Sequence, residues 1–421
     1  MTSQNMQRVK GLGLIPNDWE VIEANSLCSK ITKGTTPPSG DLADKGEIPF
    51  LRVTNLTFQG RPNFNDIKYV SREIHSGFLA RSKAYPGDIL MNIVGPPLGQ
   101  FALLNEEFGE YNLNQAVIIF RASSTKITNT YLLHYLMSSV ALKWLESFSK
   151  KTSGQQNLTI QLCKDLPIPV PSAMEQRLIV KTLATWDRAI EKTEALIEAK
   201  ERRKAGLMQR LLTSKVRFGE FAGETWKEMS IGKLLRQVKR PVVWDDDASY
   251  KLLSLRRASG GLFHRQTLRG SEILTKKMNT ALEGDFLISK MQVVHGATGL
   301  TTAKFDGYHV SDSYLSYVAR DPSTLDIRFF NWLCKTKEMY HKAYRSSYGV
   351  HIEKMTFNPK LWLKETIMLP PTTEEQAKIV EVLDTSVAEI EEHRTQLAAL
   401  KEQKKGLMQQ LLTGKVRVKV S

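Results

Sequence analysis

Three short stretches of the sequence carry residue types that other proteins use for catalysis, but none has the spacing that the reaction needs. Gly95-Pro97 (GPP) lacks the acidic or amide residue before it, and the aromatic residue after it, with which an amino-methyltransferase holds its base. Glu198-Ala199-Lys200 has the letters of a nuclease site, but falls inside a predicted helix without an upstream carboxylate in register. Asp245-Asp246-Asp247 are consecutive, so their carboxylates do not converge on one metal ion. We interpret the last two stretches as a solvated helix face and a surface acidic turn.

Cofactor and metal motifs are also missing from the sequence. No Gly-rich loop follows a predicted strand in dinucleotide or S-adenosylmethionine fashion, and no GxxxxGK[ST] segment could cradle phosphates. Cys28, Cys163 and Cys334 lie far apart without a CxxC pair, so we expect free thiols, buried or at the surface, and neither zinc nor disulfides. We therefore predict that this chain catalyses nothing and holds no metal or cofactor of its own.

The charge of the chain points to a polyanionic partner. Its 421 residues include 59 Lys and Arg against 44 Asp and Glu, a formal charge of +15 spread through a globular composition. DNA or RNA is the favoured partner, ahead of a membrane surface or a purely solubilising charge. The N-terminal residues contain no apolar run of signal-peptide length, and no 18 uncharged apolar residues follow one another anywhere. We expect a soluble, cytoplasmic protein.

Several predicted loops combine cations, amides and small polar side chains, which contact phosphates and base edges in protein–DNA complexes. They include KGTTPP at 33–38, KTSGQQNLT at 151–159 and AYRSSYGVHIEK at 343–354. Each residue alone is more often a solvated loop residue, but similar loops in both halves of a basic chain favour DNA binding. The candidate DNA-contacting residues are Lys33, Thr35, Arg52, Thr54, Asn55, Ser153, Gln155, Gln156, Asn157, Arg256, Arg257, Lys290, Arg345, Ser346, Ser347, Tyr348 and His351.

The elements that position these loops include a duplicated helix. Residues 171–217 and 371–417 align without a gap at an offset of 200, with 21 of 47 positions identical, so the two segments are copies of one element. In each copy a Pro-containing extended stretch precedes Ser172 or Thr372, which can cap the helix, and the following Glu suits its positive end. The pattern predicts two helices of about 38 residues, each roughly 55 Å long.

Both predicted helices carry an apolar stripe that alternates three- and four-residue steps, as in coiled coils. Lys204 and Lys404 interrupt the two stripes at the same place. We predict that the helices pair with each other in antiparallel sense, although each stripe could instead pack only on its neighbouring domain. The predicted helix-pairing residues are Ile179, Leu183, Ile190, Ile197, Leu207, Leu211, Ile379, Leu383, Ile390, Leu397, Leu407 and Leu411.

The segments outside the helices repeat more faintly. Trp19 aligns with Trp226, and FLRVTNLTFQGR aligns with SLRRASGGLFHR, which places Arg52 opposite Arg256. Short β-branched and aromatic runs predict strands, and each half then has a helical patch, near 130–148 and 326–343. The predicted strands cover residues 48–53, 87–94, 114–120, 251–257, 284–289 and 313–319. We predict an α/β (α+β) chain with domains at 1–165 and 218–365 and helical regions at 166–217 and 366–421.

These motifs resemble one family, the specificity subunits of type I restriction-modification systems (HsdS). The features that carry the resemblance are the P-x-x-x-E-Q-x-x-I-V helix openings, the GLMQ-x-LLT-x-K-V-R helix ends, and TSGQQNLT leading into LPIPVP. The second half ends in GVHIEKMTFNP and departs from the SGQQNL letters of the first. The resemblance covers the whole chain.

The resemblance implies a division of labour in a larger complex. Each of two target-recognition domains would read one half of a bipartite DNA site, and the paired helices would set the spacer between the halves. Two methyltransferase subunits, using S-adenosylmethionine at adenine N6, would dock on this chain, and restriction subunits that use ATP and Mg would join them. Two alternatives stay open at this point: an enzyme with a diverged site, and a coiled-coil adaptor whose charge serves solubility alone.

Overall fold

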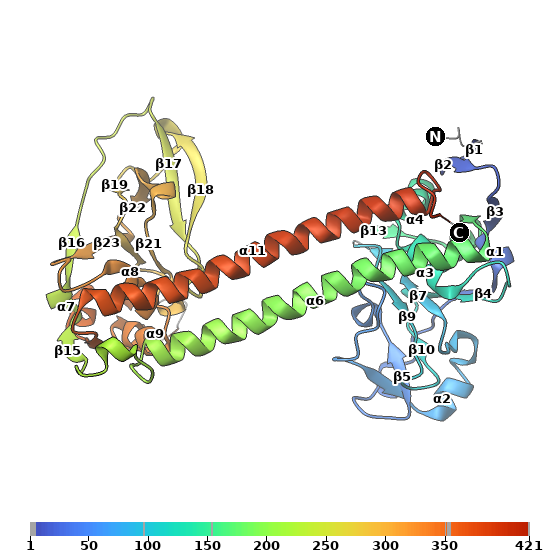
Figure 1. The fold of residues 1–421 in the computed structure, drawn as a ribbon, viewed down its shortest axis with the longest axis horizontal. Coiled ribbons are helices and arrows are strands. Elements are labelled where there is room, and N and C mark those ends of the chain that lie inside the picture. The colour runs from blue at the N-terminus through green and yellow to red at the C-terminus, as the bar shows by residue number, and fades with distance from the viewer. Residues whose placement is uncertain (1–5, 96, 153–154, 350, 352–354, 420–421) are drawn as a thin grey trace. The chain divides into compact units, whose positions relative to one another are not determined.

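The computed structural model describes residues 6–95, 97–152, 155–349, 351 and 355–419. The chain forms two compact units, Met1–Glu194 with Thr395–Ser421, and Ala195–Arg394. Two long helices, α6 (Ala173–Leu211) and α11 (Thr373–Leu411), each contribute one part to each unit (Figure 1). Every unit therefore consists of one mixed α/β domain and segments of both long helices.

The first domain is built on a four-stranded antiparallel sheet in the order β4-β11-β7-β9. A second sheet, β10-β5-β6, contains one parallel pair, and smaller sheets join β1 to β2, β14 to β3, and β12 to β13 and β8. The strands are β1 (Met6–Val9), β2 (Gly13–Pro16), β3 (Glu20–Glu23), β4 (Cys28–Lys33), β5 (Ile48–Leu51), β6 (Lys68–Val70), β7 (Ile89–Asn92), β8 (Val94–Gly95), β9 (Phe101–Leu103), β10 (Asn112–Leu113), β11 (Val117–Ala122), β12 (Lys150–Thr152), β13 (Gln155–Asn157) and β14 (Pro167–Val170). Its helices are α1 (Ala24–Leu27), α2 (Arg72–Ser76), α3 (Asn129–Leu136), α4 (Ser139–Phe148) and α5 (Ile160–Lys164).

The second domain repeats this plan. Its antiparallel sheet β16-β23-β20-β21 corresponds to the first four-stranded sheet, and a second sheet has the order β18-β17-β22-β19, again with one parallel pair. The strands are β15 (Lys227–Ser230), β16 (Leu235–Val238), β17 (Ser249–Leu255), β18 (Leu262–Arg269), β19 (Met278–Ala281), β20 (Phe286–Ser289), β21 (Thr298–Leu300), β22 (Tyr308–Ser311), β23 (Tyr314–Ala319), β24 (Ser347–Tyr348), β25 (Thr356–Phe357) and β26 (Thr366–Leu369). Its helices are α7 (Ile231–Leu234), α8 (Ile327–Leu333), α9 (Lys337–Arg345) and α10 (Pro359–Trp362).

Each predicted helical patch is divided into two helices. The hydroxyl of Ser138 accepts a hydrogen bond from the Ala141 amide and starts α4, and the hydroxyl of Thr336 accepts one from the Met339 amide and starts α9. A hydroxyl N-cap begins a new helix because it satisfies an amide that has no partner within the helix. The two patches therefore form the pairs α3–α4 and α8–α9.

The long helices match the sequence expectation closely. Both span 39 residues, and the Ser172 and Thr372 hydroxyls accept hydrogen bonds of 3.3 Å from the amides of Glu175 and Glu375. Their ends are part of the domain cores. Ile179, Leu183 and Leu411 share one buried cluster with the first domain, and Leu211, Ile379 and Leu383 share another with the second.

Candidate functional site

The start of α6 is held by a buried carboxylate. Glu175 is 2% exposed, and its oxygens accept hydrogen bonds from the Trp19 indole (3.1 Å) and from Nε and Nη2 of Arg417 (2.5 and 2.8 Å). Arg417 also donates two hydrogen bonds to Asp18, at 3.0 and 2.9 Å. These bonds, first to Glu175 and then to Asp18, raise the pKa of the guanidinium beyond its ordinary value. The C-terminal end of one repeat copy thus closes on the start of the other copy.

The second unit contains the same junction. Glu375 is fully buried, and it accepts hydrogen bonds from the Trp226 indole (3.3 Å) and from Nε and Nη2 of Arg217 (2.8 and 2.7 Å). A buried carboxylate is stable only when it is paired and hydrogen-bonded. The Trp, Glu and Arg positions that repeat in the sequence therefore meet in space, and the Arg of each copy serves the Glu of the other.

The glutamine that follows each buried glutamate ties the long helix to its domain. The Gln176 side chain accepts a hydrogen bond from the Thr128 amide (3.1 Å) and donates to the Lys126 carbonyl (2.6 Å), just before α3. Gln376 accepts from the Asp326 amide (2.8 Å) and donates to the Thr324 carbonyl (3.0 Å), just before α8. The Glu-Gln pair in the repeat is therefore a junction motif, and sequence reasoning noted its identity without its role.

Within each unit the segments of α6 and α11 run antiparallel. Ion pairs join the two helices. In the first unit the α6 residue number rises as the α11 number falls, and in the second unit the same trend runs from Lys200–Glu389 to Arg217–Glu375, just beyond the end of α6. In the first unit these pairs are Asp187–Lys404 (2.5 Å) and Glu194–Lys401 (2.7 Å); in the second they are Lys200–Glu389 (2.7 Å) and Glu201–Arg394. Lys404, which interrupts the apolar stripe, is only 8% exposed because its ammonium group pairs with Asp187. The predicted antiparallel pairing is confirmed in both units.

The predicted helix-pairing residues are buried or half-buried in the structure. Ile179, Leu183, Ile190, Ile197, Leu211, Ile379, Leu383, Ile390 and Leu411 are buried, and Leu207, Leu397 and Leu407 are half-buried. The ends of each stripe pack in the domain cores, but the stripes do not pack on the neighbouring domains alone, because ion pairs also join the two helices to each other.

Two of the candidate DNA-contacting residues in the first domain hold a loop together instead of facing solvent. Asn55 is 1% exposed, and its amide donates hydrogen bonds to the carbonyls of Asn63 (2.8 Å) and Asp66 (3.1 Å). The Arg52 guanidinium makes an ion pair of 2.9 Å with Asp66. The alignment of Arg52 with Arg256 does not reveal this, because Asp66 lies 14 residues further along the chain.

Other candidates of the first domain are accessible. Lys33, at the end of β4, and Thr54 are exposed, and the Thr35 hydroxyl accepts a hydrogen bond from Arg81 (3.2 Å). Ser153 lies outside the described residues. The backbone of Gln155, Gln156 and Asn157 forms strand β13 between β12 and β8, where the sequence predicts a loop, and Asn157 is exposed.

The comparable turn of the second domain is partly buried. Arg345 makes an ion pair of 2.8 Å with Glu365. Ser346 is 1% exposed and Ser347 donates its hydroxyl to the Ala343 carbonyl, so contact of either serine with DNA would require the turn to open. Tyr348 and His351 are exposed. Like β12 and β13 in the first domain, β24 and β25 follow the helix pair and precede the last strand.

The remaining candidates are two arginines of the β17–β18 hairpin and a lysine that follows β20. Arg256 and Arg257 are exposed in its turn, where the Arg256 guanidinium lies 4.4 Å above the Phe263 ring, and Lys290 is half-buried after β20. The sequence predicts that the first strand of this hairpin ends at Arg257. In the structure β17 ends at Leu255, because Ala258 and Ser259 adopt the left-handed conformation of a tight turn. Sequence reasoning also missed the exposed basic residues of β18.

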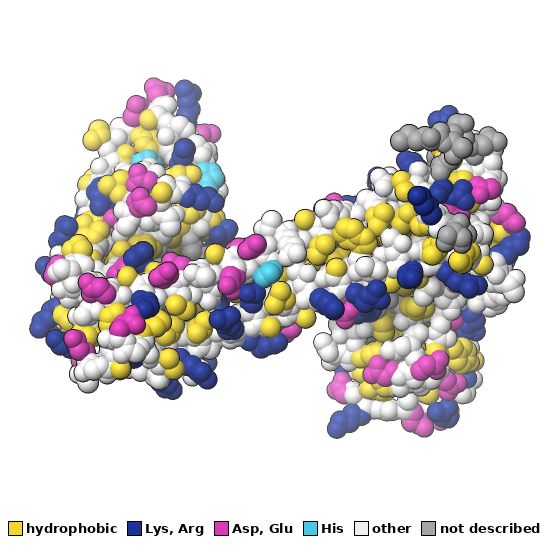
Figure 2. All heavy atoms as spheres, viewed as in Figure 1, with side chains coloured by type: hydrophobic (Ala, Val, Ile, Leu, Met, Phe, Trp, Pro, Cys, Tyr) yellow, Lys and Arg dark blue, Asp and Glu magenta, His cyan; other side chains and the backbone are white. Residues whose placement is uncertain are grey.

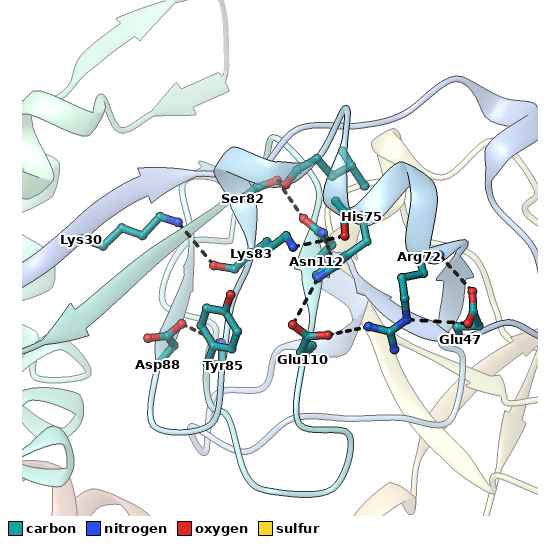
Figure 3. Close-up of polar contacts among 12 residues, drawn as sticks. Lys30, Glu47, Arg72, His75, Ser82, Lys83, Tyr85, Asp88, Glu110 and Asn112 are labelled. Carbon is teal, nitrogen blue, oxygen red and sulfur yellow. Dashed lines mark hydrogen bonds and ion pairs between the residues drawn. The ribbon is translucent and has the colours of Figure 1, made fainter.

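A polar cluster in the first domain, in which His75, Ser82 and Asn112 are buried, is a structural feature. The Ser82 hydroxyl donates to the Asn112 side chain (2.8 Å), whose amide lies 2.5 Å from Nδ1 of His75, and Arg72 reaches Glu110 at 3.1 Å (Figure 3). Burial, with a smaller contribution from Lys83, lowers the pKa of His75. The cluster joins α2 to β10. Across the described part of the chain, no group of three or more His, Cys, Asp or Glu side chains could hold a metal ion.

The comparisons with known proteins agree with this architecture. The family model for the type I restriction modification DNA specificity domain matches residues 16–201 and 251–402. The chain belongs to this family. It is 24% identical over 449 residues to a putative type I restriction enzyme specificity subunit, MjaX, of Methanocaldococcus jannaschii, covering 97% of this chain and 96% of that one.

Solved structures support the same fold. The HsdS subunit of Thermoanaerobacter tengcongensis aligns with a TM-score of 0.51 at 16% identity, over 96% of this chain and 98% of its own. A chain from a structure described as the basis of complex assembly and conformational transition of the type I R-M system aligns with a TM-score of 0.59 at 15% identity, over 96% and 99%. As a type I specificity subunit, the chain recognises DNA sequence.

The surface of the specificity subunit suits a DNA partner. Figure 2 shows Lys and Arg side chains on both units, rather than gathered in one tail.

The three cysteines are free and buried, and burial raises the pKa of Cys28 and of Cys163 to about 12. No helix among the described residues is long and apolar enough to cross a membrane.

Proposed function

We propose that each domain of this specificity subunit reads one half of a bipartite DNA site. The observation that carries the proposal is the repeated junction, in which Trp19, Glu175 and Arg417 in one unit match Trp226, Glu375 and Arg217 in the other. Because the same contacts join each domain to the long helices, two equivalent domains are available to bind the two halves of one DNA site.

The spacer between the half-sites would be set by the paired helices. Both helices span 39 residues, which corresponds to about 58 Å at 1.5 Å per residue. Ion pairs such as Asp187–Lys404 and Lys200–Glu389 keep the helices in one register within each unit. A fixed register is what a ruler requires, because a slip would change the preferred spacing.

The chain would act as a scaffold without chemistry of its own. Charged residues in the stretches that resemble catalytic motifs form ion pairs within the chain: Lys200 with Glu389, Glu198 with Arg202, and Asp246 with Lys276. Methyltransferase subunits docked on the helical regions would flip the target adenine and methylate N6 with S-adenosylmethionine. Restriction subunits that use ATP and Mg would join this complex in the cytoplasm.

Mapping of N6-methyladenine in the host genome tests the proposal. Wild-type cells, cells lacking this one chain, and deleted cells that express it again are compared. We expect a split motif, with fixed bases on both sides of a fixed gap, that disappears with the deletion and returns with the re-expressed chain. A motif that persists in the deletion strain would contradict the proposal. In a strain without detectable methylation, purified methyltransferase complex and host DNA replace the cells in the same comparison.

A further inference from the structure

The β17–β18 hairpin has an irregularity at one arginine. Strand β18 is the edge strand of its sheet, and its register against β17 shifts so that Leu252 lies opposite Gln266 while Leu253 lies opposite His264. Arg265 is the extra residue of this bulge. Bulges at sheet edges reorient a side chain and are common next to functional sites.

The tip of this hairpin is held in place by the rest of the domain. Ala258 and Ser259 both have a φ of 54°. The Ala258 amide donates to the His295 carbonyl (2.7 Å), and the Ser259 hydroxyl lies 2.6 Å from the hydroxyl of Tyr340. Non-glycine residues keep this conformation only when their surroundings impose it. The strand that carries Arg265 is therefore fixed relative to its domain.

Arg265 differs from the arginine with which it aligns. The alignment of FLRVTNLTFQGR with SLRRASGGLFHR places Arg61 opposite Arg265. Arg61 makes two hydrogen bonds to Glu191 of α6, at 2.8 and 3.1 Å, so its charge is neutralised within the first unit. Glu391, which aligns with Glu191, pairs with Arg394. Arg265 is exposed, and no carboxylate in the described part of the chain forms an ion pair with it.

Neighbouring side chains make this edge suitable for a nucleic acid. Lys251 lies 5.7 Å from the centre of the Tyr308 ring, and the His264 ring meets that ring edge-on at 5.7 Å. Arg256 covers Phe263 on the same hairpin. Cations interleaved with aromatic rings attract phosphates, and the major groove of DNA is wide enough for a two-stranded β-ribbon.

We propose that Arg265 reads a guanine in the half-site of the second domain, with the β17–β18 edge in the major groove. This inference rests on the proposed function. An arginine in a fixed strand can donate two parallel hydrogen bonds to O6 and N7 of guanine, the commonest specific contact between proteins and DNA. Lys reproduces this contact less well, because its ammonium group is a point charge on a flexible stem without the planar pair of donors.

The test compares Arg265→Ala and Arg265→Lys with Arg269→Ala. Arg269 is an exposed arginine of the same strand, but it lies in regular register opposite Ser249. The full chain, assembled with its methyltransferase subunits, selects sites from a duplex library that is randomised at every position of both half-sites. Selected sequences are then counted for each variant at the same salt concentration.

We expect both Arg265 variants to lose preference for guanine at one position of one half-site by about 10- to 100-fold. The other half-site should stay unchanged, and Arg269→Ala should keep the wild-type motif. Uniform weakening of all sequences, equal in Arg265→Ala and Arg269→Ala, would mean phosphate contact only and would overturn the inference, as would an unchanged motif. Selection of no split motif by the wild-type complex would refute the proposed function itself.

Discussion

Arg417, which follows α11, donates two hydrogen bonds to Glu175 at the start of α6, although 242 positions separate them in the chain. Arg217 makes the equivalent contact with Glu375, 158 positions further on. Each repeat copy contributes an arginine that satisfies the buried glutamate of the other copy. The two copies therefore depend on each other: the arginine of each copy pairs with the glutamate of the other copy, and neither arginine pairs with the glutamate of its own copy.

Removal of one junction arginine should destabilise the protein. Arg417→Ala leaves the buried Glu175 carboxylate with the Trp19 indole as its side-chain partner, because Arg417 supplies the only cation paired with it in the described structure. We expect a loss of about 3 kcal/mol in the free energy of unfolding, since breaking a buried pair strands a charge. Urea denaturation of the purified chain measures this loss.

A matched control uses an exposed pair between the same helices. Arg394 binds Glu201 and Glu391, and the side chains of all three are 41–59% exposed. Arg394→Ala should cost less than about 1 kcal/mol, because water screens and replaces such pairs. Equal losses in the two variants would show that Glu175 is not effectively buried.

Stability should fall in mild acid because of His134. Burial, with a smaller contribution from Lys404, lowers the pKa of His134 to about 4. Between pH 6.5 and 4 the unfolded chain binds a proton at this position and the folded chain does not, so lowering the pH favours unfolding. The expected loss from pH 7 to pH 5 is about 2 kcal/mol. His134→Gln should remove this part of the pH dependence in urea denaturation; parallel curves for wild type and variant would contradict the assignment.

Lengthening both long helices should lengthen the preferred DNA spacer. Seven residues inserted after Glu194 and after Arg394 add about 10 Å to each helix and preserve the heptad pattern, which corresponds to about three base pairs. The spacer is read by site selection with the methyltransferase complex. An insertion in one helix alone serves as the control, because it shifts the register of pairs such as Glu194–Lys401 and should weaken binding at every spacing. Undiminished binding to the original spacer by the double insertion would refute the ruler.

The two half-sites should respond to separate substitutions. Asn157 of the first domain and Tyr348 of the second are both exposed, and they end strands β13 and β24, which both follow the helix pair of their domain. Asn157→Ala should change preference in one half-site and Tyr348→Ala in the other, each by about 10-fold, while assembly with the methyltransferase stays intact. Site selection and gel filtration of the complex measure the two effects. A change in both half-sites from one substitution would contradict independent reading.

Much of the fold follows from local signals in the sequence. The ends of α6 and α11 and their hydroxyl caps at Ser172 and Thr372 agree with prediction, and each of the six predicted strands overlaps a strand of the structure. Helix periodicity and N-caps are properties of a few neighbouring residues, so a single chain displays them. The repeat of one helix at an offset of 200 residues also indicates that the chain consists of two related halves.

The sequence by itself determined the two long helices, the two helical patches and six of the strands, and that this plan occurs twice, because periodicity, capping and repetition are readable along the chain. Only the tertiary structure decided which partners the polar and charged side chains outside the helix caps have. It joined Arg52 to Asp66 and Arg61 to Glu191, buried Asn55 and Ser346, and left Arg265 exposed at a bulge. The physical reason is that an arginine binds whichever carboxylate folding brings within about 3 Å, and that distance depends on the packing of the whole domain.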